Sequence, residues 1–326
     1  MPALLREWRY HHRQPSTCSL DYVFALLAPG QGSQTPGMLT SWLELEGTRE
    51  RVAAWSELAG LDLVELGTVA DADAIKDTAV TQPLVVAASL LAYEVLSQRQ
   101  ELPADTVVAG HSVGELAAAA IAGVMSADDA VALAAVRGRA MAAACELAPT
   151  GMAAVMGGEP DQVVAWLDKF DLAAANMNGA GQIVAAGPIE GVDAVVAEER
   201  PDFVKKVIKL KVAGAFHTHY MAPAQDTLRE KAKDIVVADP ARTVLSNADG
   251  QRVASGAEML ERLVNQVTLS VRWDQCMTTM ASLGVTTVAE LPPAGALTGL
   301  VKRELKITTA ALKTPDDLAK VAEVSA

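Results

Sequence analysis

The stretch Gly110-His111-Ser112-Val113-Gly114 lies between two segments of different character. Residues 106–109, Thr-Val-Val-Ala, form a short apolar run typical of a buried strand, and residues 115–125 have the composition of a helix. The stretch has the form G-x-S-x-G, the pattern of a nucleophile elbow, in which a serine occupies a sharp turn between a strand and a helix. The flanking glycines are needed because such a turn is strained and crowded. The pattern therefore predicts that Ser112 is a nucleophile in covalent acyl chemistry.

The pentapeptide alone is a weak signal, since it occurs by chance in about one chain in ten of this length. An ordinary turn serine is the alternative at position 112. The strand before the turn and the helix after it are the context that favours a catalytic serine.

Strands and helices alternate along most of the rest of the chain. Strand patterns occupy residues 22–28, 106–109, 243–246 and 286–290, and helix patterns occupy residues 82–98, 115–125 and 127–146. This alternation is typical of an α/β core with a mostly parallel sheet. Together with the elbow it predicts a large α/β-hydrolase-like domain, built discontinuously from residues 22–149 and 213–312.

Residues 150–212 have a different rhythm, which begins after the break Pro149-Thr150-Gly151. Strand patterns at residues 152–156, 172–177, 182–186 and 203–212 alternate with helix patterns at residues 159–170 and 189–199. The order β-α-β-β-α-β is the signature of a ferredoxin-like fold. We therefore expect an inserted α+β subdomain of about sixty residues.

The composition excludes several classes of function. The 326 residues are 51% hydrophobic, enough for a large core, and their formal net charge is −13, whereas a nucleic-acid-binding protein is normally basic. The apolar runs are too short to cross a bilayer. The three cysteines, Cys18, Cys145 and Cys276, are too far apart to indicate a disulfide framework or a zinc site, which favours the reducing cytoplasm.

The two ends of the chain are set apart from this core. Residues 1–21 are basic and lack the apolar segment of a secretory signal, so we expect a disordered extension. His11 and His12 within it are expected to bind no metal. Residues 313–326 are expected to form a C-terminal tail.

A serine hydroxyl needs a base within hydrogen-bond reach, and histidine suits that task near neutral pH. The chain has five histidines, of which two lie in the N-terminal extension. His111 is next to the serine, but neighbouring residues on an elbow point in different directions. His217 and His219 remain, where the inserted subdomain returns to the core, and a domain junction is a common place for a site. The residues favour His217 slightly, and His219 stays an alternative.

Four short motifs in a fixed order give the chain a resemblance to a known family. They are Gly30-Gln31-Gly32-Ser33-Gln34, Gly110-His111-Ser112-Val113-Gly114-Glu115, Arg137-Gly138-Arg139 and Ala215-Phe216-His217. With this combination, residues 22–312 resemble the malonyl-CoA:acyl-carrier-protein transacylases of bacterial fatty-acid synthesis, and the segment Ala-Gly-Ala-Phe-His-Thr is most similar to the actinobacterial branch. The resemblance implies a ping-pong reaction. A serine takes malonyl from coenzyme A, and the phosphopantetheine thiol of acyl carrier protein then removes it.

The resemblance also implies catalytic roles. Ser112 would carry the malonyl ester, and His217 would move the proton in both half-reactions. A backbone carbonyl at the position of Gln266 would orient the imidazole, which makes a Ser-His dyad. The backbone N–H groups of Gln31 and Val113 would form the oxyanion hole.

Arg137 would bind the free carboxylate that distinguishes malonyl from acetyl, because a guanidinium fork matches a carboxylate. From the residues alone, a surface ion pair on the helix at 127–146 is the better interpretation, and the resemblance reverses that preference. Gln82 would support the site, with a helix cap as its equal alternative. Four further residues are expected around the acyl group: His111, Phe216, Asn178 and Asn247.

Four lysines form a basic cluster on the predicted strand at 203–212, namely Lys205, Lys206, Lys209 and Lys211. A lysine run is by default a solvated face. This one stands out against the acidic background, and the carrier-docking lysines of the family correspond best to Lys205 and Lys206. We expect malonyl-CoA and acyl carrier protein as partners of a cytoplasmic monomer. We expect no nucleic acid, membrane, metal or bound cofactor, since malonyl-CoA would be a substrate.

Two other functions remain open. One is a serine thioesterase or hydrolase of the α/β-hydrolase type, in which Asp171 or Asp202 would stand between the serine and the histidine in chain order. The other is a non-catalytic module that binds carrier protein. A hydrolase has no need of Arg137 or of the Gln31 loop, and a binding module has no need of an intact serine and histidine.

Overall fold

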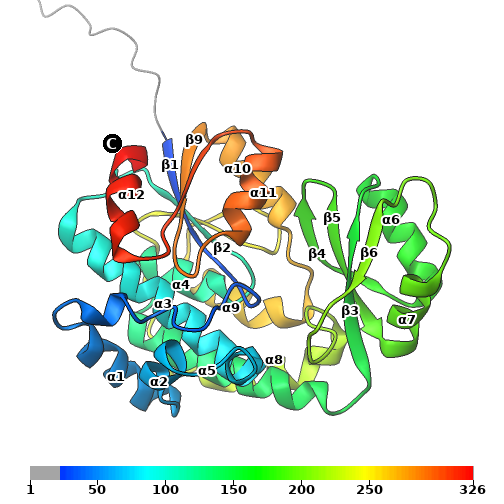
Figure 1. Ribbon diagram of the computed structural model, residues 1–326, viewed down its shortest axis with the longest axis horizontal. Coiled ribbons are helices and arrows are strands. Elements are labelled where there is room, and N and C mark those ends of the chain that lie inside the picture. Colours follow the sequence, from blue (N-terminus) through cyan, green and yellow to red (C-terminus); the bar gives the residue numbers. More distant parts are fainter. Residues whose placement is uncertain (1–22, 326) are drawn as a thin grey trace, which may run out of the picture.

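The computed structural model describes residues 23–325, which form two lobes of unequal size, each built around its own sheet (Figure 1). The large lobe contains six strands in the order β10-β9-β1-β2-β7-β8. Neighbouring strands from β10 to β7 are parallel, and β8 runs antiparallel to β7. The predicted α/β fold with a mostly parallel sheet is confirmed. The strands are β1 (Val23–Ala28), β2 (Val107–Gly110), β7 (Thr243–Leu245), β8 (Arg252–Val253), β9 (Val285–Glu290) and β10 (Thr308–Ala311).

Helices cover both faces of the large sheet. Successive side chains of a strand point to opposite faces, so Phe24 and Leu26 of β1 enter one buried cluster while Ala25 and Leu27 enter another. Helices α10 and α11 close the second cluster, and α3, α4 and α5 close the first. The helices of this lobe are α1 (Thr48–Ala59), α2 (Leu63–Thr68), α3 (Thr78–Arg99), α4 (Gly114–Ile121), α5 (Ala127–Cys145), α8 (Ala222–Ala232), α9 (Gly256–Asn265), α10 (Trp273–Ser282), α11 (Ala296–Glu304) and α12 (Leu318–Ser325).

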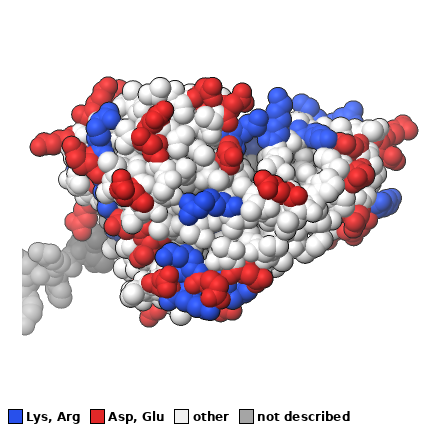
Figure 2. Space-filling view, turned by 90° about the horizontal axis from the view of Figure 1, so that it is seen from below, with Lys and Arg blue, Asp and Glu red and all other residues white. Residues whose placement is uncertain are grey.

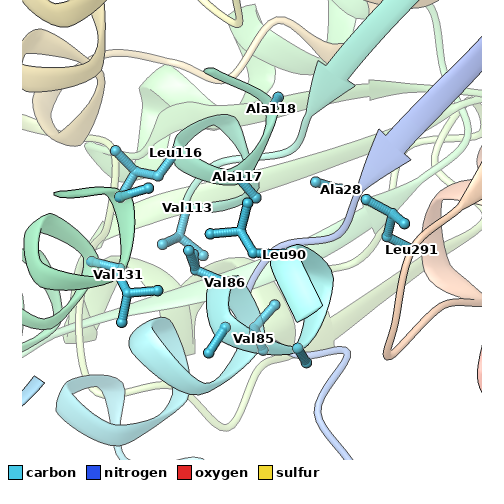
Figure 3. Close-up of a cluster of buried hydrophobic side chains, with 14 of the residues drawn as sticks. Ala28, Val85, Val86, Leu90, Val113, Leu116, Ala117, Ala118, Val131 and Leu291 are labelled. Carbon is cyan, nitrogen blue, oxygen red and sulfur yellow. The ribbon is translucent and has the colours of Figure 1, made fainter. Parts of the chain in front are cut away.

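Helix α4, which follows the elbow, is packed on several sides. Figure 3 shows Val113 and Ala117 close to Leu90 of α3, with Ala28 at the end of β1 nearby. Ala117, Ala118 and Ala119 are fully buried. These small side chains allow α4 to lie close to its neighbours, so the turn that carries Ser112 rests on a close-packed base.

The small lobe is the inserted subdomain. Its four strands are antiparallel to their neighbours and lie in the order β4-β5-β3-β6, which is the ferredoxin-like arrangement of a β-α-β-β-α-β chain. Two helices cover one face, and on the other face Met152 and Val184 join the core of the large lobe. The elements are β3 (Thr150–Met156), α6 (Pro160–Leu167), β4 (Ala173–Gly179), β5 (Gln182–Pro188), α7 (Ile189–Ala197) and β6 (Lys206–Lys209).

Two predicted elements are shorter than expected. Helix α4 ends at Ile121 rather than at residue 125, because Gly123 has a φ of +84°, a conformation that ends a helix. Strand β6 is shorter than the predicted segment at 203–212, because it is an edge strand that pairs with β3 alone.

Helix α3 is longer than expected and begins at Thr78, where the side chain of Asp77 accepts a hydrogen bond from the Ala79 N–H. By length and composition alone α3 could cross a membrane, but 78% of that stretch is buried inside the fold. Its apolar character is explained by its place in the core of the large lobe.

Of the two predicted terminal segments, only the C-terminal one lies within the described residues. Within the predicted C-terminal tail at 313–326, residues 318–325 form α12, whose Leu318 and Val321 are buried in the core of the large lobe. The predicted N-terminal extension at residues 1–21, with Cys18 and the pair His11 and His12, lies outside the described residues.

Candidate active site

Ser112 lies at the turn between β2 and α4 with a φ of +53°, a conformation that residues other than glycine rarely adopt. A Cβ at Gly110 would meet the Gly114 backbone at 2.1 Å, and a Cβ at Gly114 would meet the Ala28 carbonyl oxygen at 2.3 Å. The turn can close only because both positions are glycine. Its geometry exposes Ser112 to a cavity of about 250 Å³ between the two lobes.

The loop that carries Gln31 lies directly against the elbow. A Cβ at Gly30 would meet the His111 carbonyl oxygen at 2.6 Å, so the loop can approach only with glycine there. Gln31 lines the same cavity as Ser112. Within residues 23–325, the backbone N–H groups of Gln31 and Val113 donate to no other protein group. Both donors are therefore free to bind a negatively charged oxygen.

His217 is the histidine beside the serine. Its Nε2 lies 2.7 Å from Ser112 Oγ, and its Nδ1 lies 2.9 Å from the backbone oxygen of Gln266. A carbonyl only accepts, so Nδ1 carries the ring proton and Nε2 is left to accept the Ser112 proton. His217 is buried and has a φ of +60°, a second strained backbone at the site.

His219 is directed elsewhere. It is exposed, its ring centroid lies 4.2 Å from that of Tyr220, and it lines a different hollow, together with Asp171. Neither Asp171 nor Asp202 contacts His217, whose Nδ1 is occupied by the Gln266 carbonyl. The residues thus form the geometry of a dyad rather than that of a hydrolase triad.

The protonation state of His217 leads to a pH prediction. Burial, reinforced by the charge of Arg137, lowers the pKa of His217 to about 3. Because an ordinary histidine has a pKa near 6.5, this imidazole stays neutral, and able to accept a proton, in mildly acidic solution. We expect the rate at which phenylmethanesulfonyl fluoride labels Ser112 to fall only below about pH 5. An acid limb with its midpoint near pH 6.5, in protein shown by circular dichroism to be folded, would contradict this.

Arg137 is buried at 2% exposure, so the surface ion pair considered from the sequence is wrong. Its NH1 donates to Gln82 Oε1 at 2.7 Å, and its NH2 donates to Gln266 Oε1 at 2.8 Å and to Ser112 Oγ at 3.3 Å. Burial lowers the pKa of Arg137 to about 10, which still leaves it charged at neutral pH. The site therefore holds a buried cation whose hydrogen-bond partners are all neutral, namely two amides and the Ser112 hydroxyl.

Gln82 is fully buried inside α3 and does not cap that helix. The alternative role as a cap is therefore wrong, because Asp77 occupies that position. By holding Arg137, the Gln82 side chain fixes one end of the guanidinium.

Three of the four residues expected around the acyl group line the cavity, namely His111, Asn178 and Phe216. His111 Nε2 lies 2.9 Å from Asn178 Oδ1, and its ring meets that of Trp273 edge-on with centroids 5.7 Å apart. Burial lowers the pKa of His111, which favours its neutral form. The contact between His111 and Asn178 joins the elbow to β4 of the small lobe across the cavity.

Asn247 was expected to line the cleft, and it does not. It is fully buried behind the elbow, where Oδ1 accepts a hydrogen bond from the Ser112 N–H at 2.8 Å and Nδ2 donates to the Gly110 carbonyl at 2.8 Å. Its side chain satisfies the backbone groups that the sharp turn leaves without partners. Asn247 therefore stabilises the strained turn instead of touching a substrate.

Comparison with known proteins agrees with this geometry. Residues 22–319 match the protein family described as acyl transferase domain. The malonyl CoA-acyl carrier protein transacylase of Mycolicibacterium smegmatis is 56% identical over 289 residues, which cover 86% of this chain and 98% of that protein. This chain belongs to the malonyl-CoA:acyl-carrier-protein transacylase family. A crystal structure of MCAT from Mycobacterium tuberculosis has 52% identity and a TM-score of 0.88, over 92% of this chain and 100% of the other.

A second solved structure contains a partner. It is described as a type II PKS acyl-carrier protein in complex with its malonyl-transacylase, with 29% identity and a TM-score of 0.84 over 92% of this chain and 99% of the other. The transacylase in that complex therefore shares the fold described above.

Several residues in the wall of this cavity could not be predicted from the sequence. The small lobe contributes Met152, Asn176, Val184 and Leu210, and the large lobe contributes Met141. These residues come from four strands or strand ends and a helix, so no local motif marks them. The sequence marks Glu115 only as the last residue of the elbow motif, whereas the structure buries it behind the site at 1% exposure.

The lysine cluster is divided between the two ends of β6. Lys206 pairs with Met156 at one end of β3, whereas Leu210, which lines the cavity, bonds to Met152 at the other. Four residues of extended chain separate Lys206 from Leu210 by about 13 Å. Lys211 lines the cavity, and Lys209 forms an ion pair with Asp193. Figure 2 shows basic side chains gathered over the small lobe, on the right of that view.

Proposed function

We propose that this chain transfers malonyl from malonyl-CoA to the phosphopantetheine thiol of acyl carrier protein, through a malonyl ester on Ser112. The observation that carries the proposal is the convergence of three groups on one cavity. They are the Ser112 hydroxyl, the His217 imidazole at 2.7 Å and the buried Arg137 guanidinium at 3.3 Å. A nucleophile and its base suit acyl transfer, and a fixed cation beside them suits an acyl group with a free carboxylate.

In the first half-reaction, Ser112 Oγ attacks the thioester carbonyl carbon while its proton moves to His217 Nε2. The carbonyl oxygen becomes an oxyanion, which the N–H groups of Gln31 and Val113 bind. When the tetrahedral intermediate collapses, the carbon–sulfur bond breaks and the imidazolium returns its proton to the departing thiolate. The products are free coenzyme A and the malonyl-Ser112 ester.

The second half-reaction reverses these roles. The phosphopantetheine thiol gives its proton to His217, and its sulfur attacks the ester carbonyl. Collapse of the intermediate expels Ser112 Oγ, which takes the proton back from the imidazolium. The enzyme is restored and the malonyl thioester has moved to the carrier protein.

The carboxylate of the substrate also acts on the base. The charge of Arg137 is one cause of the low pKa of His217, because a nearby cation disfavours the imidazolium. A malonyl carboxylate bound to Arg137 offsets that charge. The correct substrate therefore makes His217 a stronger base, whereas an acetyl group brings no charge and leaves the pKa of His217 as low as before.

A hydrolase is the main competing function, and the use of water as the acceptor distinguishes it. We expect the purified protein to release coenzyme A in a single burst with malonyl-CoA alone, and to turn over continuously only when phosphopantetheinylated carrier protein is added. Continuous release of free malonate at the same rate without carrier protein would favour the hydrolase instead.

Docking of the carrier protein is a separate prediction. Lys205 and Lys206 are exposed on the small lobe, and an acidic carrier needs a basic surface to approach a protein of net charge −13. We expect Lys205→Glu with Lys206→Glu to raise the KM for carrier protein about tenfold, with an unchanged KM for malonyl-CoA.

Lys231→Glu with Lys233→Glu is the matched control, since these lysines, the first half-buried and the second exposed, lie at the end of α8 in the large lobe. An unchanged carrier KM in the Lys205 and Lys206 variant, or an equal rise in the control, would end the docking proposal.

We further propose that the transacylase works without a bound cofactor, as a monomer in the cytoplasm. The serine, the imidazole and the guanidinium supply the nucleophile, the proton transfer and the charge recognition that the reaction needs.

A further inference from the structure

Glu115 is a buried carboxyl group to which the reaction above assigns no role. It lies in the first turn of α4, three residues after Ser112, and is 1% exposed. A buried carboxylate is costly unless its oxygens receive hydrogen bonds or an opposite charge. The partners of Glu115 therefore indicate what it does.

Each carboxylate oxygen of Glu115 accepts a hydrogen bond from a residue that itself contacts Ser112. Oε1 accepts a hydrogen bond from the backbone N–H of Asn247 at 2.6 Å, and Oε2 accepts one from Gln266 Nε2. Asn247 binds the Ser112 N–H, and Gln266 Nε2 also donates to the Ser112 carbonyl at 3.0 Å. The carboxylate thus connects the two residues that fix the backbone of the nucleophile.

The same contact fixes the orientation of the Gln266 amide. The amide lies between a guanidinium, which only donates, and a carboxylate, which only accepts. The Gln266 oxygen must therefore face Arg137, at 2.8 Å, while its NH₂ group faces Glu115. The Ser112 carbonyl is the second acceptor of this NH₂ group. Without the carboxylate the NH₂ group keeps one acceptor of two, and the amide oxygen is held less firmly toward Arg137.

The spacing of the charges matters as well. Burial raises the pKa of Glu115 to about 7, while Asn247, Gln266 and Arg137 favour its ionised form. Arg137 contacts the amides of Gln82 and Gln266 rather than a carboxylate. The negative charge that compensates Arg137 is therefore held one amide away, which leaves the guanidinium free for a carboxylate that enters from the cavity.

We propose that Glu115 is a positioning residue for recognition of the dicarboxylic acyl group: through Gln266 it holds Arg137 toward Ser112 and balances its charge without occupying it. This inference rests on the proposed malonyl transfer. A residue needed only for folding would affect all acyl groups alike, whereas a residue that acts through Arg137 affects malonyl more than acetyl.

The test compares acylation of Ser112 by malonyl-CoA and by acetyl-CoA at pH 8, which lies above the pKa of Glu115 and favours its carboxylate form. We expect Glu115→Gln to lower the malonylation rate about 100-fold and the acetylation rate less than fivefold. Glu258→Gln is the matched control, because Glu258 also lies in the first turn of a helix but is exposed and pairs with Arg262. An equal loss for both acyl groups, or no loss for either, would overturn the proposal.

A double variant separates folding from recognition. Glu115→Gln with Gln266→Glu restores a donor and an acceptor between positions 115 and 266 but moves the carboxylate directly against Arg137. It also removes the N–H that Gln266 donates to the Ser112 carbonyl. We expect this variant to recover part of the melting temperature lost by Glu115→Gln, and to remain as poor with malonyl-CoA as the single variant. Recovery of malonyl selectivity together with stability would refute the role assigned to the spacing of the charges.

Protection of Ser112 from a covalent inhibitor by free malonate can be measured without acyl transfer. It therefore tests the role of Glu115 separately from the proposed function. Sodium malonate should protect wild-type Ser112 from phenylmethanesulfonyl fluoride more strongly than sodium acetate does, and Glu115→Gln should reduce that preference at least tenfold. If wild-type protein forms no malonyl ester, the proposed function fails, while malonate protection still tests the clamp. Equal protection by malonate in the wild type and in Glu115→Gln would refute the inference about Glu115 alone.

Discussion

Replacement of Ser112 by alanine is expected to lower the rate of malonyl transfer by about 10⁵- to 10⁶-fold, because the acyl-enzyme can no longer form. Oxyanion donors and substrate binding remain, but without a nucleophile they contribute little to a two-step transfer. The measurement is the steady-state rate of coenzyme A release in the presence of carrier protein.

The fold of the Ser112→Ala variant is expected to persist. Alanine keeps the Cβ that the strained φ already accommodates, and the hydrogen bond from the Ser112 N–H to Asn247 is made by the backbone. Ser97→Ala serves as a control for removal of a hydroxyl, since Ser97 lies on the exposed side of α3. Residual transfer above about 1% of wild type in a folded Ser112→Ala variant would show that another group carries the acyl chain.

The second large effect is expected from Arg137→Ala. Removal of one partner of a buried charge pair typically costs about 3–5 kcal/mol, so we expect kcat/KM for malonyl-CoA to fall by about 10²- to 4 × 10³-fold. Acetyl-CoA has no carboxylate to bind, and its transfer should hold or rise. The loss of the cation should also raise the pKa of His217, since Arg137 is one cause of its low value.

Arg139→Ala is the matched control for this experiment. Arg139 lies two residues further along α5, and its NH1 donates to the Ala59 carbonyl at 2.8 Å, away from the cavity. The control should keep the ratio of malonyl to acetyl activity. If Arg137→Ala reduced both activities by the same factor, the guanidinium would be structural and not a determinant of the acyl group.

The local parts of the site could be predicted from the sequence because neighbouring residues determine them. The strand, the two glycines and the helix around Ser112 lie within about twenty residues, and steric crowding at Gly110 and Gly114 leaves little choice of geometry. The ferredoxin-like lobe was likewise predictable from the order of its elements, since right-handed crossovers permit few arrangements.

The remaining parts depend on contacts between distant segments. His217 could be distinguished from His219 on the residues alone only weakly, because the choice depends on a chain reversal that brings position 217 to position 112. Asn247 was expected around the acyl group, whereas the structure uses it to satisfy the backbone of the elbow. The link from Glu115 to Gln266 spans 151 residues and could not be predicted from either motif.

The cluster at β6 shows a further limit. The lysines are adjacent in sequence, but alternation along a strand and the length of its pairing with β3 direct them to different surroundings. Lys211 lines the cavity, whereas the other three lysines, all of them among the described residues, do not. A charge pattern in a sequence therefore predicts that a basic surface exists, but not which end of it lies beside the chemistry.

The central claim is a covalent malonyl group on the elbow serine, and mass spectrometry of the acid-quenched, digested protein tests it most directly. After brief exposure to malonyl-CoA, the peptide that contains Ser112 should carry one malonyl group, and the group should move to the phosphopantetheine thiol when carrier protein is added before the quench. An unmodified Ser112 peptide, or a malonyl group found only on another residue such as the partly exposed Cys145, would contradict the account.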